Sequence, residues 1–359
     1  TLTGTAEANA TVAILANGTQ IGTADADDDG NWSFTIGDAN ALPDGEVNFT
    51  ATATDAAGNV SPASPSFTLN VDTVDPMAPA IDPTNGDIIT GTAEPGSTVT
   101  LTDDAGNAIG DPALVDGDGN WSVTPSDPLA DGDTINATAT DAAGNTSDPA
   151  TAIVDTAAPN AGDNDIEIND GGDGFLNADE AGNVTLSGSL ESDATVSSLI
   201  ISDASGNTVT VDPADITVDA DGNLTTNGVD LSGLTDGELT ATLSVTDAAG
   251  NTGTVTDTST LDSVAPEVPT PTLAVDTATD GDGITRDPMI SVDGLEGEAT
   301  WEYSTDGGDS WTPGTGTAFE LPEGDYAAGA VQVRQTDAAG NTSGVGNLGA
   351  VTIDVTDPV

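Results

Sequence analysis

Residues 135–145 read Ile-Asn-Ala-Thr-Ala-Thr-Asp-Ala-Ala-Gly-Asn. The first six residues alternate between apolar side chains and Asn or Thr, which is the two-residue period of a half-buried β-strand. The last five are turn formers, because Asp and Asn bond their own backbone and Gly accepts a positive φ. The stretch therefore predicts a strand that ends in a tight turn.

The last six residues of this stretch recur along the chain. Thr-Asp-Ala-Ala-Gly-Asn stands at 54–59, 140–145, 246–251 and 336–341, so successive copies begin 86, 106 and 90 residues apart. These spacings suit a seven-stranded sandwich of about 100 residues, and they are too long for propeller blades or helical repeats. Each copy is followed by an acidic string that ends in Pro, such as residues 71–76. Because Pro fixes its own φ and donates no hydrogen bond, these strings predict short, stiff linkers.

The repeats and linkers together predict an all-β chain of four tandem immunoglobulin-like domains in an extended rod. Each domain would be a seven-stranded Greek-key β-sandwich, because short alternating strands are separated by turn signals and no helical period occurs. The predicted domains are residues 1–73, 74–156, 157–263 and 264–359. We expect the first to begin at its second strand and so to lack strand A. The third and fourth carry acidic, Gly-rich inserts at 163–180 and 276–287.

The charge of the chain limits the classes of partner that it can bind. The 359 residues include 62 Asp and Glu but only two Lys and Arg, with no His and no Cys, for a net charge of −60. Such a surface excludes nucleic acid as a partner, and no apolar run is long enough to insert into a membrane. Without thiolate or imidazole groups only oxygen ligands remain, which favours Ca²⁺ over zinc or copper. Like charges at this density also destabilise a compact state unless cations neutralise them.

Acidic side chains are predicted to gather at the end where each domain begins. In a seven-stranded sandwich the B–C, C′–E and F–G turns share that end with the incoming linker. Ca²⁺ takes six to eight oxygen ligands in flexible geometry, and acidic turns supply them. We therefore expect several Ca²⁺ ions at the junctions, with ligands drawn from Asp72, Asp75, Glu94, Asp116, Asp118, Asp141, Asp155, Glu191, Asp219, Asp221, Asp247, Asp262 and Asp337.

Three pairs within this set join a linker to the following F–G turn: Asp72 with Asp141, Asp155 with Asp247, and Asp262 with Asp337. Asp, Asn and Gly are also the ordinary residues of tight turns. A plain turn therefore stays open as the interpretation of any single loop.

The insert of the third domain is similar to part of an EF-hand loop. Asp173, Asn177 and Glu180 fall at its fifth, ninth and twelfth positions, but Asn169 and Gly171 replace the usual acids at the first and third. A Ca²⁺-holding loop and a plain acidic loop both stay open here. The insert of the fourth domain is comparable, with Asp280 and Asp282 as candidate ligands.

Several longer strings resemble bacterial immunoglobulin-like repeats of giant RTX-type adhesins that are exported by type I secretion. They are TDAAGN, VDTAAP at 154–159, GTAEPGSTV at 91–99 and DGDGNW at 116–121. The resemblance implies a structural spacer, rigidified by Ca²⁺ at its junctions, that projects a distal adhesive domain for cell adhesion or biofilm formation. It also implies an extracellular monomer at the bacterial cell surface, with Ca²⁺ and neighbouring repeats as partners and an export signal outside this sequence.

An enzyme is not expected. The chain has no His, no Cys nucleophile, no Gly-x-Ser-x-Gly elbow and no P-loop, and its acidic pairs recur once per repeat, unlike an active site. Two alternatives to the spacer remain open. One is a ligand-binding adhesin module in which the fourth domain holds a sugar or peptide on Trp301, Tyr303 and Trp311. The other is a set of disordered acidic repeats that only buffer calcium.

Overall fold

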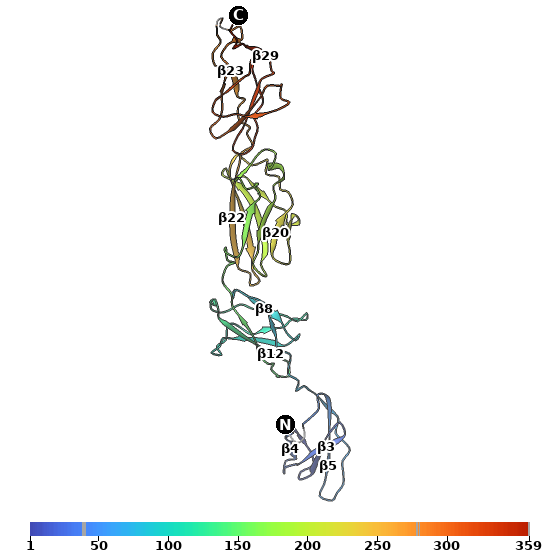
Figure 1. The fold of residues 1–359 in the computed structure, drawn as a ribbon. Helices are drawn as coiled ribbons and strands as arrows, with labels where there is room; N and C mark the ends of the chain where they lie inside the picture. The colour runs from blue at the N-terminus through green and yellow to red at the C-terminus, as the bar shows by residue number, and fades with distance from the viewer. Residues whose placement is uncertain (38–40, 278, 280, 358–359) are drawn as a thin grey trace. The chain divides into compact units, whose positions relative to one another are not determined.

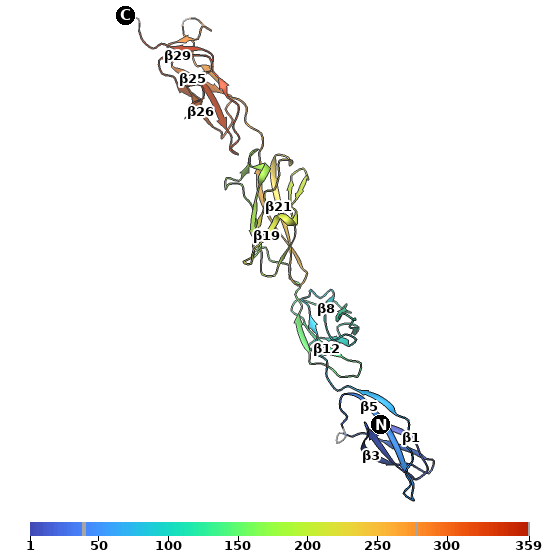
Figure 2. The ribbon, with the colours of Figure 1, turned by 90° about the vertical axis from the view of Figure 1, so that its right-hand side faces the viewer.

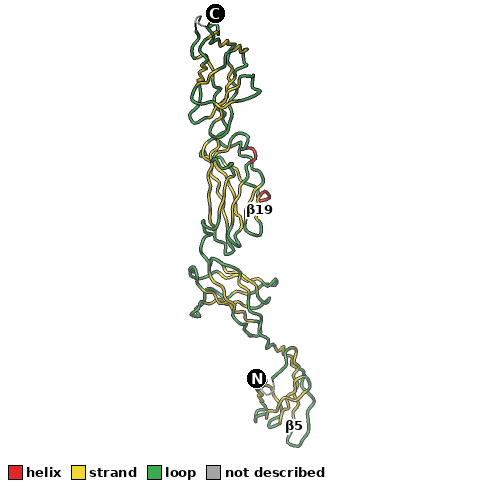
Figure 3. Tube along the Cα trace, viewed as in Figure 1, coloured by secondary structure: helices red, strands yellow, loops and turns green. Residues whose placement is uncertain are grey.

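The computed structural model describes residues 1–37, 41–277, 279 and 281–357, and this part of the chain consists of strands and loops with two short 3-10 turns (Figure 3). No helix in it is long and apolar enough to cross a membrane. The chain divides into two compact units, residues 1–156 and 157–359. Each unit holds two separate hydrophobic cores.

Residues 76–156, all of which the structure describes, show the basic domain. Two antiparallel sheets face each other, with strand orders β11-β8-β7 and β10-β9-β12-β13 (Figure 1). The strands are β7 (Ala80–Ile81), β8 (Ile89–Thr92), β9 (Thr98–Thr102), β10 (Ala113–Leu114), β11 (Asn120–Val123), β12 (Thr134–Thr140) and β13 (Ala150–Ile153). This order corresponds to the A, B and E strands and the C′, C, F and G strands of an immunoglobulin sandwich.

The alternation seen in the sequence produces the core of this domain. In β12 the side chains of Ile135, Ala137 and Ala139 are fully buried, whereas the intervening Asn and Thr side chains are half-buried. They pack against Val99 and Leu101 of β9 and against residues of the facing sheet. The predicted all-β, immunoglobulin-like class is confirmed.

Residues 1–73 form the same sandwich with one difference. Their sheets are β1-β4 and β3-β2-β5-β6, made of β1 (Leu2–Thr5), β2 (Thr11–Ala16), β3 (Thr19–Asp25), β4 (Asn31–Phe34), β5 (Gly45–Thr54) and β6 (Phe67–Val71). Strand β1 pairs with β4 alone, whereas its counterpart β8 pairs on both edges. A groove of about 890 Å³ lies there, lined by Leu2, Val12, Ile14, Trp32, Phe49 and Phe67 among others.

Residues 157–263, called the third domain below, contain the largest hydrophobic core among the described residues. Its sheets are β14-β16-β20-β19 and β15-β22-β21-β17-β18, and β19 and β21 mark the two layers in Figure 2. The elements are β14 (Asp165–Ile168), β15 (Phe175–Leu176), η2 (Ala181–Asn183), β16 (Leu186–Ser189), β17 (Thr195–Asp203), β18 (Thr208–Thr210), η3 (Pro213–Asp215), β19 (Ile216–Val218), β20 (Asn223–Thr226), β21 (Gly237–Thr246) and β22 (Thr252–Leu261).

The fourth domain divides its strands among three sheets, β23-β25-β28, β24-β32-β29 and β27-β26-β30-β31. Its strands are β23 (Thr270–Leu273), β24 (Ile284–Thr285), β25 (Met289–Asp293), β26 (Thr300–Ser304), β27 (Thr312–Pro313), β28 (Ala318–Glu320), β29 (Gly324–Tyr326), β30 (Gln332–Thr336), β31 (Gly346–Asn347) and β32 (Val351–Ile353).

The insert of the third domain is attached to the last strand of that domain. Strand β15, inside the insert, pairs in parallel with the end of β22, so that Phe175 lies beside Thr260 and Leu176 beside Leu261. Leu176 is buried in the core. The insert therefore lies beside the point where the chain leaves the third domain.

Candidate functional site at the linkers

The sequence Asp-x-x-Gly-Asn folds into the same loop in nine places along the described chain. In each loop the Asp Oδ1 accepts the backbone N–H of the Asn at 2.8–2.9 Å, and the Asp N–H donates back to the Asn carbonyl. The Gly has a φ between 81° and 97°, which a side chain would strain. The loops begin at Asp27, Asp55, Asp103, Asp116, Asp141, Asp203, Asp219, Asp247 and Asp337.

This loop unites two strings that the sequence analysis quoted separately, TDAAGN and the DGDGN of residues 116–120, whose pattern also occurs at 27–31 and 219–223. A tenth copy, residues 179–183, differs because its last three residues form η2. The shared geometry means that the first Asp of each loop is a loop-closing residue, whatever else it binds.

Asp141 shows how fully this carboxylate is engaged. Its Oδ1 accepts the N–H groups of Ala143, Gly144 and Asn145 at 2.8, 2.8 and 2.9 Å, and its Oδ2 accepts the Asn145 side-chain amide at 2.8 Å. The amide of Asn145, followed by these backbone bonds, holds the pKa of Asp141 below its usual range. Bonds from Asn120 and Asn223 likewise lower the pKa of Asp116 and Asp219.

The first linker meets the second domain through Asn145. A side-chain amide has two N–H donors; one closes the loop on Asp141, and the other donates to the backbone carbonyl of Asp72 at 3.2 Å. The Asp72 carboxylate accepts the N–H of Val74 at 3.1 Å. The predicted pair Asp72 and Asp141 is thus brought together, with the Asn145 amide rather than a carboxylate making the contact.

The linker before the fourth domain repeats this arrangement. The Asn341 amide donates to the Asp262 carbonyl at 2.7 Å and to Asp337 Oδ2 at 3.1 Å. The Asp262 carboxylate accepts the N–H of Val264 at 3.2 Å. Asn341 is only 7% exposed, so this contact is buried.

The other side of these two linkers is held by an acid from the turn just before β5 or β21, which the sequence analysis did not single out. Asp44 accepts the N–H and hydroxyl of Thr73 at 2.7 and 2.8 Å, and Asp236 accepts those of Ser263 at 3.1 and 2.8 Å. These acids belong to the recurring pattern Leu-x-acid-Gly-acid, at 42–46, 129–133, 234–238 and 321–325. That recurrence, together with the Asn of each TDAAGN, was the signal for the linker contacts.

The EF-hand-like residues make a local hydrogen-bonded turn. Asn177 Oδ1 accepts the N–H groups of Asp179 and Glu180 at 2.9 and 3.1 Å, and Glu180 Oε2 accepts the N–H of Asn177 at 3.1 Å. Asp173 accepts the N–H of Phe175 at 3.0 Å. These side chains therefore have internal partners in this structure.

The insert of the fourth domain is described in part. Asp282 accepts the N–H of Ile284 at 2.9 Å. Asp280 lies outside the described residues.

The remaining candidates lie on the turns and linkers where the sequence placed them. Asp75, Glu94, Asp118, Asp155 and Asp221 are exposed. The B–C turn touches the C′–E loop, since the Ala93 N–H donates to the Gly119 carbonyl at 2.9 Å. Glu191 accepts the N–H of Asn160 at 3.4 Å. Within the described residues no three Asp or Glu side chains come close enough to hold a metal ion. The pairing of Asp155 with Asp247 stays a prediction.

The fourth domain lacks the C′–E loop of this type and uses Gln335 instead. This side chain is fully buried at 0% exposure. Its amide donates to the carbonyls of Glu267 at 2.7 Å and Gly294 at 2.9 Å, and its Oε1 accepts the N–H of Glu296 at 2.9 Å. One side chain thus joins the incoming linker to the B–C turn and strand β30.

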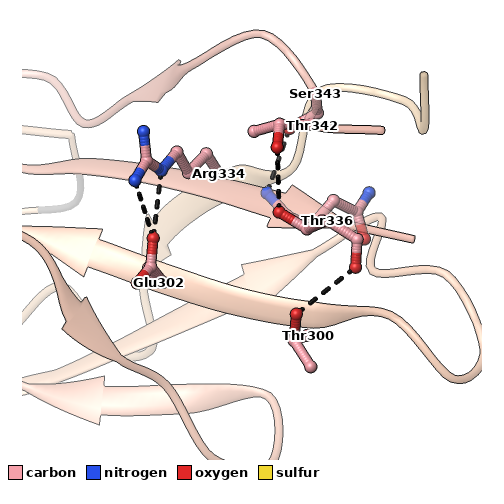
Figure 4. Close-up of polar contacts among 7 residues, drawn as sticks. Thr300, Glu302, Arg334, Thr336, Thr342 and Ser343 are labelled. Atoms are coloured by element: carbon pink, nitrogen blue, oxygen red, sulfur yellow. Dashed lines mark hydrogen bonds and ion pairs between the residues drawn. The ribbon is translucent and has the colours of Figure 1, made fainter. Parts of the chain in front are cut away.

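The aromatic residues of the fourth domain are occupied by its own structure. Trp301 is buried, Tyr303 stacks on Phe319 with ring centroids 4.1 Å apart, and the Arg334 guanidinium lies 4.1 Å from the Trp311 ring centroid. Figure 4 shows Arg334 donating twice to one carboxylate oxygen of Glu302 across β26 and β30.

The fold and the repeated loops define a class, tandem immunoglobulin-like β-sandwiches. Family models sharpen it: residues 1–73 match the Bacterial Ig-like domain and residues 76–156 the Bacterial Ig domain. These two segments are therefore similar to bacterial immunoglobulin-like domains, which confirms the resemblance to bacterial immunoglobulin-like repeats over residues 1–73 and 76–156. No curated protein matches the chain.

Two solved structures show what the chain is similar to. One is a tetra-tandem repeat in the extending region of a large adhesion protein, 26% identical with a TM-score of 0.30, covering 99% of this chain and 95% of that chain. Another is a Ca²⁺-stabilized adhesin that helps an Antarctic bacterium reach out and bind ice, 26% identical with a TM-score of 0.34, covering 98% of this chain and 93% of that chain.

Proposed function

We propose that this chain is a spacer in the extender region of a large bacterial cell-surface adhesin, rigidified by Ca²⁺ at its domain junctions. The observation that carries the proposal is the repeated joint. Two linkers are held by the same three contacts, an Asn amide from the following domain, an acid from the preceding one, and the linker Asp itself. A chain that repeats the same joint is suited to holding other domains at a distance.

The donors at these joints fit Ca²⁺ by their chemistry. The linkers and F–G loops contribute Asp72, Asp75 and Asp141 at one junction and Asp262 and Asp337 at another, all oxygen ligands of the kind that Ca²⁺ prefers. The turns beside them add Glu94, Asp116 and Asp118. The corresponding donors at the remaining junction are Asp155, Glu191, Asp219, Asp221 and Asp247. When bound, the ion would supply the positive charge that this chain lacks.

The need for such an ion follows from the composition. A net charge of −60 opposes compaction, and the chain has no Cys with which to form a disulfide. A ligand that binds only the folded state stabilises it by about 2.7 kcal/mol at a hundredfold excess over Kd. We infer that the chain works outside the cell as a monomer. There, after type I secretion, it would present a distal adhesive domain for adhesion or biofilm formation.

Small-angle X-ray scattering tests this proposal. Domains about 35–40 Å long, from strands of about eight residues at ~3.3 Å per residue plus loops, should give a rod of roughly 150 Å in millimolar CaCl₂. In EDTA we expect a broader distribution of dimensions, and MgCl₂ should resemble EDTA because Mg²⁺ releases its water reluctantly. A compact globule in CaCl₂ would disprove the spacer. Identical profiles in CaCl₂ and EDTA would disprove its rigidification by Ca²⁺.

A further inference from the structure

The insert of the third domain touches the F–G loop of the fourth. The Asn177 side-chain amide donates to the Ala339 carbonyl at 3.2 Å, and the backbone N–H of Ala178 donates to Asn341 Oδ1 at 3.1 Å. The two bonded pairs, 177 with 339 and 178 with 341, are 162 and 163 positions apart in the sequence. These bonds come in addition to the bond from Asn341 to the Asp262 carbonyl.

Contacts within the insert hold Asn177 in place independently of the fourth domain. The bonds between Asn177 and Glu180 run in both directions, which is the pattern of a capping box. The Ala181 N–H also donates to the Asn177 carbonyl at 3.0 Å. On the other side, Leu176 is anchored in the core and paired with β22. The Asn177 amide is therefore a preorganised donor, and its ordering cost on docking is small.

The receiving loop is shaped to accept this contact. Ala339 is 1% exposed and Asn341 is 7% exposed. Gly340, at a φ of 90°, leaves room for Asn177, whose amide nitrogen would lie 3.3 Å from a Cβ placed there. The Asn341 side chain uses both donors and its acceptor, on Asp262, Asp337 and Ala178. Its buried polar atoms are thus satisfied by protein groups.

We propose that residues 169–180 are a docking loop that recognises the Asp-Ala-Ala-Gly-Asn turn of the following repeat and fixes this junction even when no Ca²⁺ is bound at Asp262 and Asp337. The inference rests on the proposed spacer function and adds to it a second, metal-independent kind of joint. In this assignment Glu180 positions the loop and Asn177 binds the neighbouring repeat, although the sequence offered both as calcium ligands.

Distance measurements by pulsed electron paramagnetic resonance on the full chain test the docking loop. The chain has no Cys, so two introduced cysteines carry the only spin labels. The pair Thr217→Cys and Thr315→Cys spans the third and fourth domains, and the pair Thr19→Cys and Ser122→Cys spans the first and second. All four positions are exposed. In EDTA we expect a narrow distance distribution for the first pair and a broad one for the second.

The decisive variant is Asn177→Asp. It keeps the Oδ1 acceptor for Asp179 and Glu180 but loses the donor to the Ala339 carbonyl, so the insert stays folded while docking is lost. The matched control is Ala220→Asp, which adds the same charge and recreates the Asp-Asp-Asp-Gly-Asn sequence of residues 27–31. We expect Asn177→Asp to broaden the distribution in EDTA to that of the other junction. Ala220→Asp should leave it narrow.

The outcomes separate this inference from the proposed function. If the third and fourth domains give a broad distribution in EDTA that narrows in CaCl₂, the docking loop fails and Ca²⁺ rigidification stands. A narrow distribution unchanged by Asn177→Asp also overturns the docking loop. If neither junction responds to CaCl₂ while Asn177→Asp broadens one of them, the docking loop stands and the proposed Ca²⁺ function fails.

Discussion

The junction before the second domain and the junction before the fourth share one joint but differ in what surrounds it. In both, the side-chain amide of an Asn in the F–G loop donates a hydrogen bond to the backbone carbonyl of a linker Asp. Asn145 is half-exposed, whereas Asn341 is buried and also accepts a hydrogen bond from the docking loop. In addition, the Gln335 amide donates to the linker carbonyl of Glu267. The repeated motif therefore supplies the joint, and residues outside the motif determine how firmly it is held.

Gln335→Ala should have the largest effect on this comparison. The second domain has Ala139 at the matching position, also fully buried, so the variant makes the fourth domain resemble the second. It leaves the Glu267 and Gly294 carbonyls and the Glu296 N–H without their partner. Each buried group left unsatisfied costs about 1–3 kcal/mol. Native-state hydrogen exchange should show faster exchange at Glu296 and through residues 332–336.

Gln332→Ala is the control for that variant. Gln332 lies on β30 like Gln335, but its amide donates to Gly329 and Asn347 and not to the linker. Unchanged exchange at Glu296 in Gln335→Ala would show that the brace contributes nothing.

Asn341→Ala and Asn145→Ala compare the two joints directly. The first removes three bonds from a buried side chain and the second removes two from a half-buried one. The difference of one bond, at about 1 kcal/mol per bond, should make exchange in the loop of Asn341→Ala accelerate by roughly fivefold more than exchange in the loop of Asn145→Ala. Equal acceleration in both loops would mean that the docking loop does not strengthen the joint.

Much of this arrangement is visible in the sequence. The alternation of apolar and polar residues in β12 predicted the strand, and the spacing of TDAAGN predicted the repeats. The antiparallel order of the strands predicted the end of the domain at which Asp72 and the 141–145 loop meet. The role of Asn145 was missed because Asn in a turn has a sufficient local explanation. The contact between Asn177 and Ala339 was out of reach, since it depends on the pairing of β15 with β22, which a two-residue strand does not reveal.

Acid should weaken the joint at Asp72 before it unfolds the domain. The Asn145 amide and the loop N–H groups lower the pKa of Asp141 in the folded state below the usual value of an Asp side chain, about 3.9. Their contribution is therefore complete above about pH 3.9 and is lost as the pH falls through the lower, folded pKa. In EDTA, an NMR titration should show the Asn145 side-chain amide unchanged from neutral pH to about pH 5 and shifting below pH 4. Asp141→Asn keeps one acceptor oxygen for the loop N–H groups, loses the bond from the Asn145 amide and cannot titrate, so the pH-dependent shift of that amide should be abolished. A shift that persists in this variant would contradict the assignment.

Glu302→Gln should have the smallest effect. Glu302 and Arg334 form an ion pair at 2.8 Å on the surface of the fourth domain, with both side chains more than a third exposed. Such pairs contribute about 0–1 kcal/mol. We expect the exchange rates at Asn341 and Gln335 to stay at their wild-type values. A marked acceleration there would show that this ion pair, rather than the docking loop and Gln335, sets the strength of the junction.

Calorimetric melting in the presence and absence of calcium tests the central claim most directly. If Ca²⁺ rigidifies the chain, melting in millimolar CaCl₂ should exceed melting in EDTA by about ten degrees or more, from roughly 2.7 kcal/mol per occupied site, and MgCl₂ should stay close to EDTA. High NaCl is the control, because it screens repulsion but fills no coordination shell. If NaCl raises the melting temperature as far as CaCl₂ does, the acidic residues form only a repelling surface and the calcium-rigidified spacer is wrong.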